Sequence, residues 1–440
     1  MTTGASPSGN TDSALDLGKE TVDPNRDADK HIFSVSALTY GRGTNGKYIL
    51  FDRPRIRSIP PLVIGFLDLA NSGDFAANVF NRVPVPIYAI VLMVIGATVA
   101  LVMSTVALRD ARSSWKNLKL LREERTLLES MSDDRSAELE INHRDLGTEI
   151  FDRAGVDIAM GVGAFLIAVG TYMAIGGANH RVWFASNLLS GYVGNALPAV
   201  YGICNVGWSV HVWLRARKQV CAVSKHLHND VASQLLSVRI RKTQAHAIVT
   251  AIVCLVSGAL SMVTPTHWWP YPVLLICGLA FLYSTWVYRT QIGYERLLLS
   301  EDAVLDETSL TTEILFLQSV KIALLDSPDA WMALGLGDMS MPNLLLFLVR
   351  CDLFEQLCLE LLNDSCLIKQ HFRDPTTSPM TLDQRTLLQL DKPEQIIEIS
   401  SLARLCLEQH GIQLIKNRER LLLECLGACL LHQKGNDKDG

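Results

Sequence analysis

One uninterrupted apolar stretch limits what this chain can fold into more than any other feature. Pro84 to Leu108 covers twenty-five residues without a charge, with prolines at its start, where a missing backbone N–H costs least. A helix needs about 20 apolar residues to cross the hydrocarbon core of a bilayer. The whole chain is 49% hydrophobic and only 19% charged, with a mean hydropathy of +0.20. We therefore expect a membrane protein, with the lipid bilayer as its first partner.

Four further apolar stretches follow, so the expected fold class is all-α: a polytopic membrane protein with about five transmembrane helices. The predicted spans cover residues 84–108, 155–177, 185–213, 247–263 and 272–288 and define a transmembrane domain over 84–289. Four or six spans are the alternatives. Asp133 to Ile150, between the first two spans, is expected to be a polar linker.

The N-terminal flank divides into two parts. Residues 1–30 are mostly Thr, Ser, Gly, Asn and Asp with almost no aliphatic side chains, which predicts a disordered tail. Residues 31–83 contain the apolar stretch Ile59–Ala70, which at about twelve residues is too short to span. We expect an interfacial segment there.

The C-terminal third alternates apolar helical runs with charges and helix caps. This pattern predicts a C-terminal cytosolic helical domain over 290–433, followed by a polar tail over 434–440. The last two helices are expected at about 393–409 and 412–432.

Orientation is predicted from the positions of Lys and Arg in the short loops. The loop after span one has six positive side chains in its first turns, and the loop between spans three and four has seven. The connections 178–181 and 264–271 have one and none. These counts predict an N-terminus outside or in a lumen and a cytosolic C-terminus, and they do not distinguish plasma membrane from endomembrane. A glycan on the single sequon, at Asn363, would contradict this orientation.

The third span combines apolar residues with a polar stripe at helical spacing. The stripe consists of Asn187, Gly191, Asn195, Pro198, Gly202 and Asn205. Two interpretations stay open. Asn side chains and Gly residues commonly bond and pack against a neighbouring transmembrane helix. Alternatively, the stripe lines a path for a substrate or water, with Pro198 leaving the carbonyl of Gly194 free to accept.

Spans two and four carry small or hydroxyl faces of their own. Gly163, Gly170 and Gly177 recur one heptad apart in span two, which is typical of close helix packing. Span four has a polar face at steps of three and four, formed by Thr250, Cys254, Ser257, Ser261 and Thr264. Spans two, three and four are therefore expected to form a close-packed trio.

Ionisable and metal-ligating groups give weaker signals. Asp157 is expected to form an interfacial ion pair with Arg153. Cys425, Cys429 and His432 share one helical face, but they lack a fourth ligand and are interpreted as core residues. The sequence contains no phosphate-binding glycine loop and no hydrolase or zinc-protease motif. We expect no cofactor, no bound metal and no catalytic residue.

These features predict a non-enzymatic membrane anchor or scaffold whose cytosolic helical domain binds another protein. The alternative is a transporter or pore for a small neutral or weakly polar solute, lined by the stripe of span three. A membrane-embedded enzyme has the least support. A net charge of -5 and a pI of about 6.1 argue against a nucleic-acid partner.

Overall fold

The structure, a computed structural model, consists of two compact units. One unit contains the chain up to Asp52 together with Val320–Leu414, and the other contains Arg53–Ser319 with Ile415–Gly440. The residues described are 38–43, 47–50, 55–58, 74–80, 85–131, 135–176, 179–227, 230–299, 306–364, 380–390 and 392–439. The predicted disordered tail, 1–30, and the predicted interfacial stretch, Ile59–Ala70, lie outside these residues.

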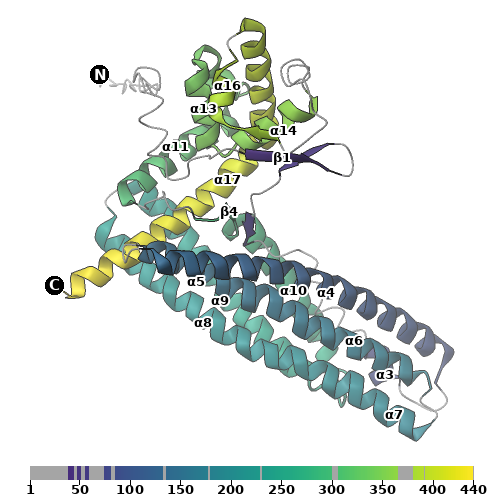
Figure 1. The fold of residues 1–440 in the computed structure, drawn as a ribbon. Helices are drawn as coiled ribbons and strands as arrows, with labels where there is room; N and C mark the ends of the chain where they lie inside the picture. The colour runs from purple at the N-terminus through teal and green to yellow at the C-terminus, as the bar shows by residue number, and fades with distance from the viewer. Residues whose placement is uncertain are drawn as a thin grey trace, which may run out of the picture. The chain divides into compact units, whose positions relative to one another are not determined.

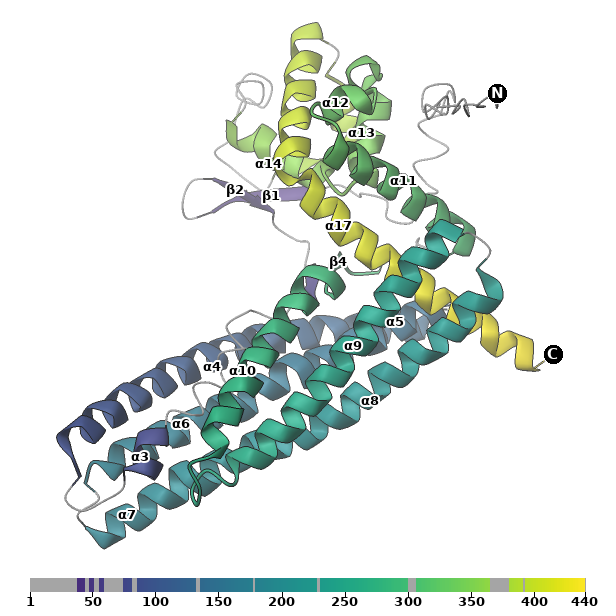
Figure 2. The ribbon, with the colours of Figure 1, turned by 180° about the vertical axis from the view of Figure 1, so that it is seen from behind.

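The second unit is a bundle of long helices that lie side by side (Figures 1 and 2). Its helices are α3 (Phe75–Val79), α4 (Ile87–Ser130), α5 (Ser136–Thr148), α6 (Val156–Ala174), α7 (His180–Ser186), α8 (Gly194–His226), α9 (Asp230–Ser261) and α10 (Pro270–Val287). The π-helical segments η4 (Glu149–Gly155), η5 (Asn187–Val193) and η6 (Tyr288–Ile292) continue these helices. Near one end of the bundle lies the last part of α17 (Pro393–Asp439). The expected polar linker over 133–150 is wrong for its described part, because α5 runs through η4 into α6.

Close approach of α4 and α6 follows from small residues at steps of three and four. The buried face of α4 begins with Ala89, Met93, Ala97, Ala100, Ser104 and Ala107. A Cβ added to Gly161 of α6 would lie 3.0 Å from the Cβ of Ala107, and the Ser104 hydroxyl donates to the carbonyl of Gly161 at 2.7 Å. This 3.5-residue repeat is the one that packs helices in a left-handed coil.

Within the described part of the chain, five helices are long and apolar enough to cross a membrane. They are Ile87–Ser130, Ser136–Ala174, Val231–Ser261, Pro270–Ile292 and Glu307–Asp326. Four of them contain predicted spans one, two, four and five. The helix of predicted span three is not among the five, because its Asn and Gly residues lower its hydropathy. The fifth is α11 (Glu307–Asp326), which the sequence placed in the C-terminal helical domain.

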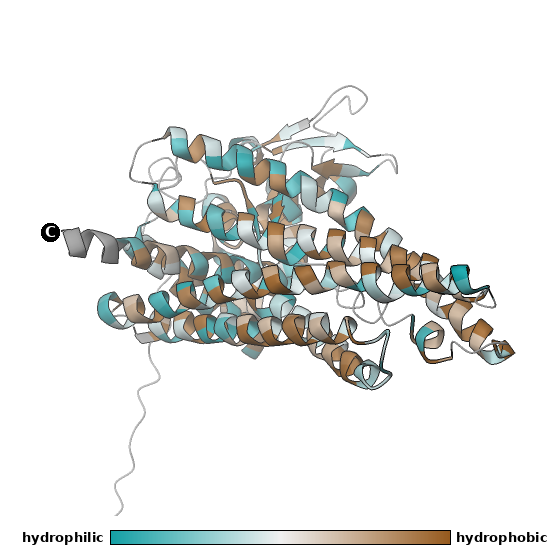
Figure 3. Cartoon of the chain, turned by 90° about the horizontal axis from the view of Figure 1, so that it is seen from below, coloured by the Kyte–Doolittle hydropathy of each residue, from teal (hydrophilic) through white to brown (hydrophobic). Residues whose placement is uncertain are grey.

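Large exposed apolar side chains cover one part of the bundle. They include Ile87, Val91, Ile95, Val99 and Val102 on α4, Val200 and Ile203 on α8, Ile252 on α9, and Ile276 and Leu279 on α10. We call this surface the apolar belt. After Leu108, α4 exposes Arg109 and Arg112 instead. Figure 3 shows the difference, with brown residues dominating one half of the bundle and teal residues more frequent in the other.

The first unit combines short helices with a three-stranded antiparallel sheet of order β2-β1-β5. Its elements are β1 (Leu38–Arg42), β2 (Tyr48–Leu50), α12 (Ala330–Ala333), η7 (Leu336–Asp338), α13 (Met341–Arg350), α14 (Phe354–Asp364), β5 (Met380–Leu382), α16 (Gln384–Leu388) and parts of α11 and α17. Tyr40, Leu348, Phe354 and Leu382 are fully or almost fully buried in it. The two helices predicted at 393–409 and 412–432 are one continuous helix, α17, which passes through Gly411 and includes the described part of the predicted polar tail.

Strand pairing restricts the orientation that the chain can take in a membrane. β1 pairs with β5, and β3 (Arg55–Arg57) pairs with β4 (Glu295–Leu297). Paired strands lie on one side of any membrane. Residues 31–83 outside and a cytosolic chain after residue 290 would separate these paired strands. Short strands far apart in sequence carry no signal of their pairing, and the loop charges near span one did not reveal it.

β3 and α3 contact different levels of the bundle. Arg153 Nη1 donates to the carbonyl of Arg57 in β3 at 3.2 Å, whereas Ala76 of α3 belongs to the same core cluster as Ala174. Arg153 and Ala174 lie about 30 Å apart along their helix, which matches the thickness of a bilayer's hydrocarbon core.

These contacts predict that the two ends of the chain lie on the same side of the membrane. Epitope tags placed before β1 and after α17 should become accessible together when one face of the membrane is exposed. A tag between α6 and α7 serves as the control and should respond to the opposite face. Tags at the two ends that respond to opposite faces would contradict the pairing of the strands.

Candidate functional site

The predicted polar stripe lies on η5 and α8 and is mostly buried. Asn187 and Gly191 belong to η5, and Asn195, Pro198, Gly202 and Asn205 belong to α8. Asn187 is half-buried, and the other five are buried. The neighbours of α8 in the bundle include α9 and α6, so the contacts of the stripe can be followed residue by residue.

Asn195 bonds to the turn after α9. Its amide nitrogen donates to Thr264 Oγ1 at 3.2 Å and to the carbonyl of Gly191 at 3.1 Å. Asp74, next to α3, is fully buried nearby and accepts a hydrogen bond from the Tyr271 hydroxyl at 3.0 Å. Asn78 also donates to Asp74, at 2.8 Å.

Asn205 bonds to η4. Its amide nitrogen donates to Asp152 Oδ1 at 3.1 Å and to the Tyr201 hydroxyl at 2.8 Å, while its oxygen accepts from Ser209 at 3.3 Å. Beside this group is a cavity of about 20 Å³, room for about one water molecule. Its lining includes Arg144, Thr148, Asp152, Trp208, His246 and Tyr288.

Glycines allow backbones to touch around the stripe. A Cβ on Gly202 would lie 2.6 Å from the carbonyl oxygen of Cys254 in α9, and one on Gly163 of α6 would lie 3.2 Å from Pro198 Cδ. A Cβ on Gly147 would lie 1.9 Å from the Trp208 ring. Backbone and ring atoms have little room to yield, so larger residues at these positions would separate the helices.

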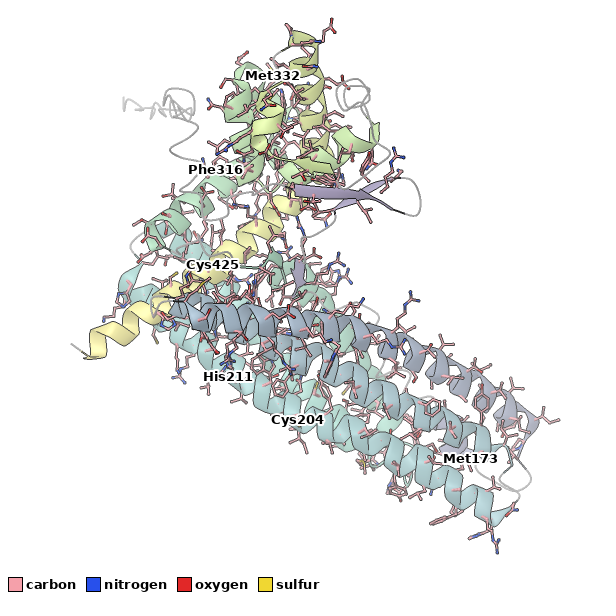
Figure 4. All side chains as sticks on the ribbon, in the orientation of Figure 1. Met173, Cys204, His211, Phe316, Met332 and Cys425 are labelled. Atoms are coloured by element: carbon pink, nitrogen blue, oxygen red, sulfur yellow. The ribbon has the colours of Figure 1, made fainter. Side chains whose placement is uncertain are left out.

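A charged cluster lies in the half of the bundle beyond the apolar belt. Glu424 of α17 contacts three buried guanidinium groups: Arg144 of α5 at 2.7 Å, Arg215 of α8 at 2.8 Å and Arg239 of α9 at 3.2 Å. Burial alone would raise the pKa of Glu424, but the three positive charges outweigh burial and lower it. We call these four residues the Glu424 cluster. Figure 4 shows the neighbouring Cys425 at this end of the bundle and Met173 at the other.

A second ion cluster joins α4, α5 and β4. Arg296 is fully buried and contacts Glu124 at 2.6 Å and Asp145 at 2.7 Å. The backbone N–H of Leu299 and the Asn142 amide also donate to Glu124, both at 2.7 Å. Burial lowers and both carboxylates raise the pKa of Arg296, and the carboxylates dominate. These bonds hold the segment that follows η6 against the bundle.

Asp157 does not form the expected ion pair. Arg153 bonds instead to Glu149 at 3.1 Å and to Asp110 of α4 at 3.4 Å. Asp157 is fully buried, and neither of its carboxylate oxygens has a hydrogen-bond partner. Three carboxyl groups, those of Asp110, Glu149 and Asp157, therefore lie around Arg153, where the sequence predicted one.

The cysteines predicted to be core residues lie in the core. Cys425 is fully buried and Cys429 is 7% exposed. Among the residues that the structure describes, no group of three or more His, Cys, Asp or Glu side chains is arranged to hold a metal ion.

The ion clusters were missed because α5 was interpreted as a linker. Its buried polar residues, Glu138, Asn142, Asp145 and Glu149, follow one another at steps of four, three and four. The same periodicity continues into the small-residue face of α6. This periodicity is visible in the sequence: buried polar residues recur at helical spacing before the apolar span and on the same face.

Replacing Asn205 with Leu should destabilise the bundle. The change would leave the buried Asp152 carboxyl without its amide donor, at a cost of about 1–3 kcal/mol. A thermal unfolding midpoint measured in detergent should fall accordingly. Cys204→Ala, at the exposed neighbouring position, is the control and should change little. An unchanged midpoint for Asn205→Leu would contradict a structural role of the Asn205–Asp152 bond.

Replacing Glu424 with Gln should cost more, about 3–5 kcal/mol, because three buried arginines would lose their shared counter-ion. Because the pKa of Glu424 is lowered, its contribution is present above the ordinary carboxyl pKa and is lost only as pH falls through the lowered value. Limited proteolysis should show release of the end of α17. Glu408→Gln, which breaks an exposed pair with Arg404, is the control and should have little effect.

Comparison with known proteins does not extend this description. No protein-family model, no curated protein and no solved structure matches the chain. The function proposed below therefore rests on the geometry of the bundle.

Proposed function

We propose that the protein is a multi-pass membrane protein that anchors its first unit to a membrane and presents that unit to a protein partner, without catalysing a reaction. The apolar belt supports the membrane location, because its large apolar side chains face away from the bundle over about the thickness of a bilayer. Five helical passages are formed by α4, α6, α7–α8, α9 and α10, and the described segments β3 and α3 contact opposite levels of the bundle. Both ends of the chain then lie on the basic side, the cytosol.

α11 is treated in this proposal as a packed helix, although its length and composition suit a span. Leu310, Ile314, Leu317 and Val320 are each 0% exposed and follow one another at steps of four and three. A buried apolar face of this kind is expected of a helix covered by protein.

We favour an anchor over a carrier because the residues of the polar stripe contact neighbouring helices and leave no channel-sized space between them. Asn195 and Asn205 use their amides on neighbouring segments, and a Cβ at Gly202 would meet the backbone of α9. The cavity beside Asn205 has room for about one water, as does the cavity of about 10 Å³ beside Arg215 and Arg239. Neither is large enough for a solute.

The Glu424 cluster supports the anchoring role. It holds α17 to α5, α8 and α9 by a buried carboxylate, and Asn417 of the same helix bonds to the backbone of Glu295 in both directions, at 2.8 and 2.9 Å. The earlier turns of α17 belong to the first unit. α17 thus belongs to the bundle at one end and to the first unit at the other, which connects that unit to the bundle through one helix.

The partner-binding side is tested on the full chain in native membranes. In the first unit, the side chains of Ile397 and Leu325 are 69% and 61% exposed. We expect Ile397→Asp or Leu325→Asp to reduce recovery of a crosslinked partner severalfold without changing insertion of the protein into the membrane. Glu408→Gln, an exposed polar change in the same unit, is the matched control. Failure of the unaltered chain to crosslink to any protein would overturn the anchor proposal.

A carrier for a small polar solute is the second candidate, favoured by the buried polar groups Asn205 and Asp152 within the bundle. Reconstituted into liposomes, an anchor should admit neutral solutes no faster than empty liposomes do. Flux that exceeds this background, and that falls with Asn187→Leu, would replace the anchor by the carrier.

A further inference from the structure

Carboxyl groups outnumber positive charges at the end of the apolar belt near Asp110. Asp110 of α4, and Glu149 and Asp157 on the η4–α6 side, surround the single guanidinium group of Arg153. Arg109 and Arg112, the next positive side chains along α4, are exposed. Three carboxylates against one guanidinium would leave a net negative charge inside a packed helix interface, which is costly without compensation.

Arg153 forms ion pairs with two of the three carboxylates. Its Nη1 contacts Glu149 at 3.1 Å and its Nη2 contacts Asp110 at 3.4 Å. Glu149 also receives a hydrogen bond from the Asn117 amide at 3.4 Å. Asp157 has no such donor, because both of its oxygens and Asp110 Oδ2 are buried without a hydrogen-bond partner.

The register of α4 against α6, set by the contacts of Ser104 and Ala107 with Gly161, brings the carboxyl of Asp110 level with Asp157, and the two carboxyl groups interact. Two carboxylates side by side have four acceptor oxygens and no donor. One proton supplies the missing donor and removes one negative charge, and like-charged carboxyl pairs in other proteins share a proton for this reason.

We propose that Asp110 and Asp157 form a proton-binding site that holds one proton between them. Asp157 is 0% exposed and is the buried member, while the Asp110 side chain is 19% exposed and provides contact with solvent. The site lies where the exposed face of α4 changes from the apolar belt to Arg109. It goes beyond the anchor proposal, which requires no proton.

The surroundings of the pair are set by the elements packed against it. η4 brings Glu149 and Arg153, and β3, whose residues are Arg55–Arg57, brings the backbone carbonyl of Arg57 to Arg153. α8 faces the other carboxyl of η4, Asp152, through Asn205. The guanidinium group of Arg153, which pairs with Asp110, is shared with Glu149.

Infrared spectroscopy of the full chain in lipid bilayers tests the proposal. At neutral pH, the spectrum of the unaltered protein minus that of Asp157→Asn should contain the C=O band of one protonated carboxylic acid, shifted in D₂O. Asp110→Asn should lose the same band, because its amide gives Asp157 a donor and removes the need for a proton. Glu129→Gln, which removes an exposed carboxylate paired with Arg125, is the control and should lose only an ionised band.

The proposal is overturned if both difference spectra contain only the loss of ionised carboxylate. A second measurement covers variants that fail to assemble. The thermal midpoint of the unaltered protein should fall as pH rises and the pair becomes fully ionised, since two adjacent buried negative charges repel. A midpoint that stays constant or rises over the same pH range would also overturn the proposal.

Discussion

The bundle depends on one carboxylate that four helices share. Glu424 is the point at which α5, α8, α9 and α17 meet, because three of them contribute an arginine to it and the fourth contributes the acid. Buried charges are tolerated only when they are paired with good geometry, so the position of each helix is restricted by where its charge can reach Glu424. The long helices of the bundle can extend beyond the apolar belt as a single packed body because their charges are matched inside it.

The two halves of the bundle are thus stabilised by different means. Within the apolar belt, small residues such as Gly161, Gly163 and Gly202 let helix backbones touch, since burial of apolar area gives little advantage where the surroundings are lipid. Beyond the belt, ion clusters at Glu424 and Arg296 replace those contacts. The carboxyl pair Asp110–Asp157 lies where the two regimes meet. The π-helical segment η4, a local widening of the helix of a kind that is frequent at functional sites, ends at Gly155, just before Asp157.

The sequence predicted what depends on local periodicity. Five apolar helices were expected and five are present, although α11 takes the place of span three, whose Asn and Gly residues lower its hydropathy. The sequence predicts that the buried amides of Asn195 and Asn205 need hydrogen-bond partners. It does not identify Thr264 and Asp152 as those partners. The pairing of β1 with β5 and of β3 with β4 joins segments hundreds of residues apart, and strands of three to five residues have no pattern that specifies a partner.

The side chain of Asn363 has a consequence for the order of folding. Its amide accepts from the backbone N–H of Tyr48 at 2.9 Å and donates to the carbonyl of the same residue at 3.5 Å, across a sequence separation of 315. At ribosomal rates of about 5–20 residues per second, the β1–β2 hairpin waits tens of seconds for this partner. β5 is made later still. The sheet of the first unit is therefore completed only after the bundle helices α3 to α10 have been synthesised.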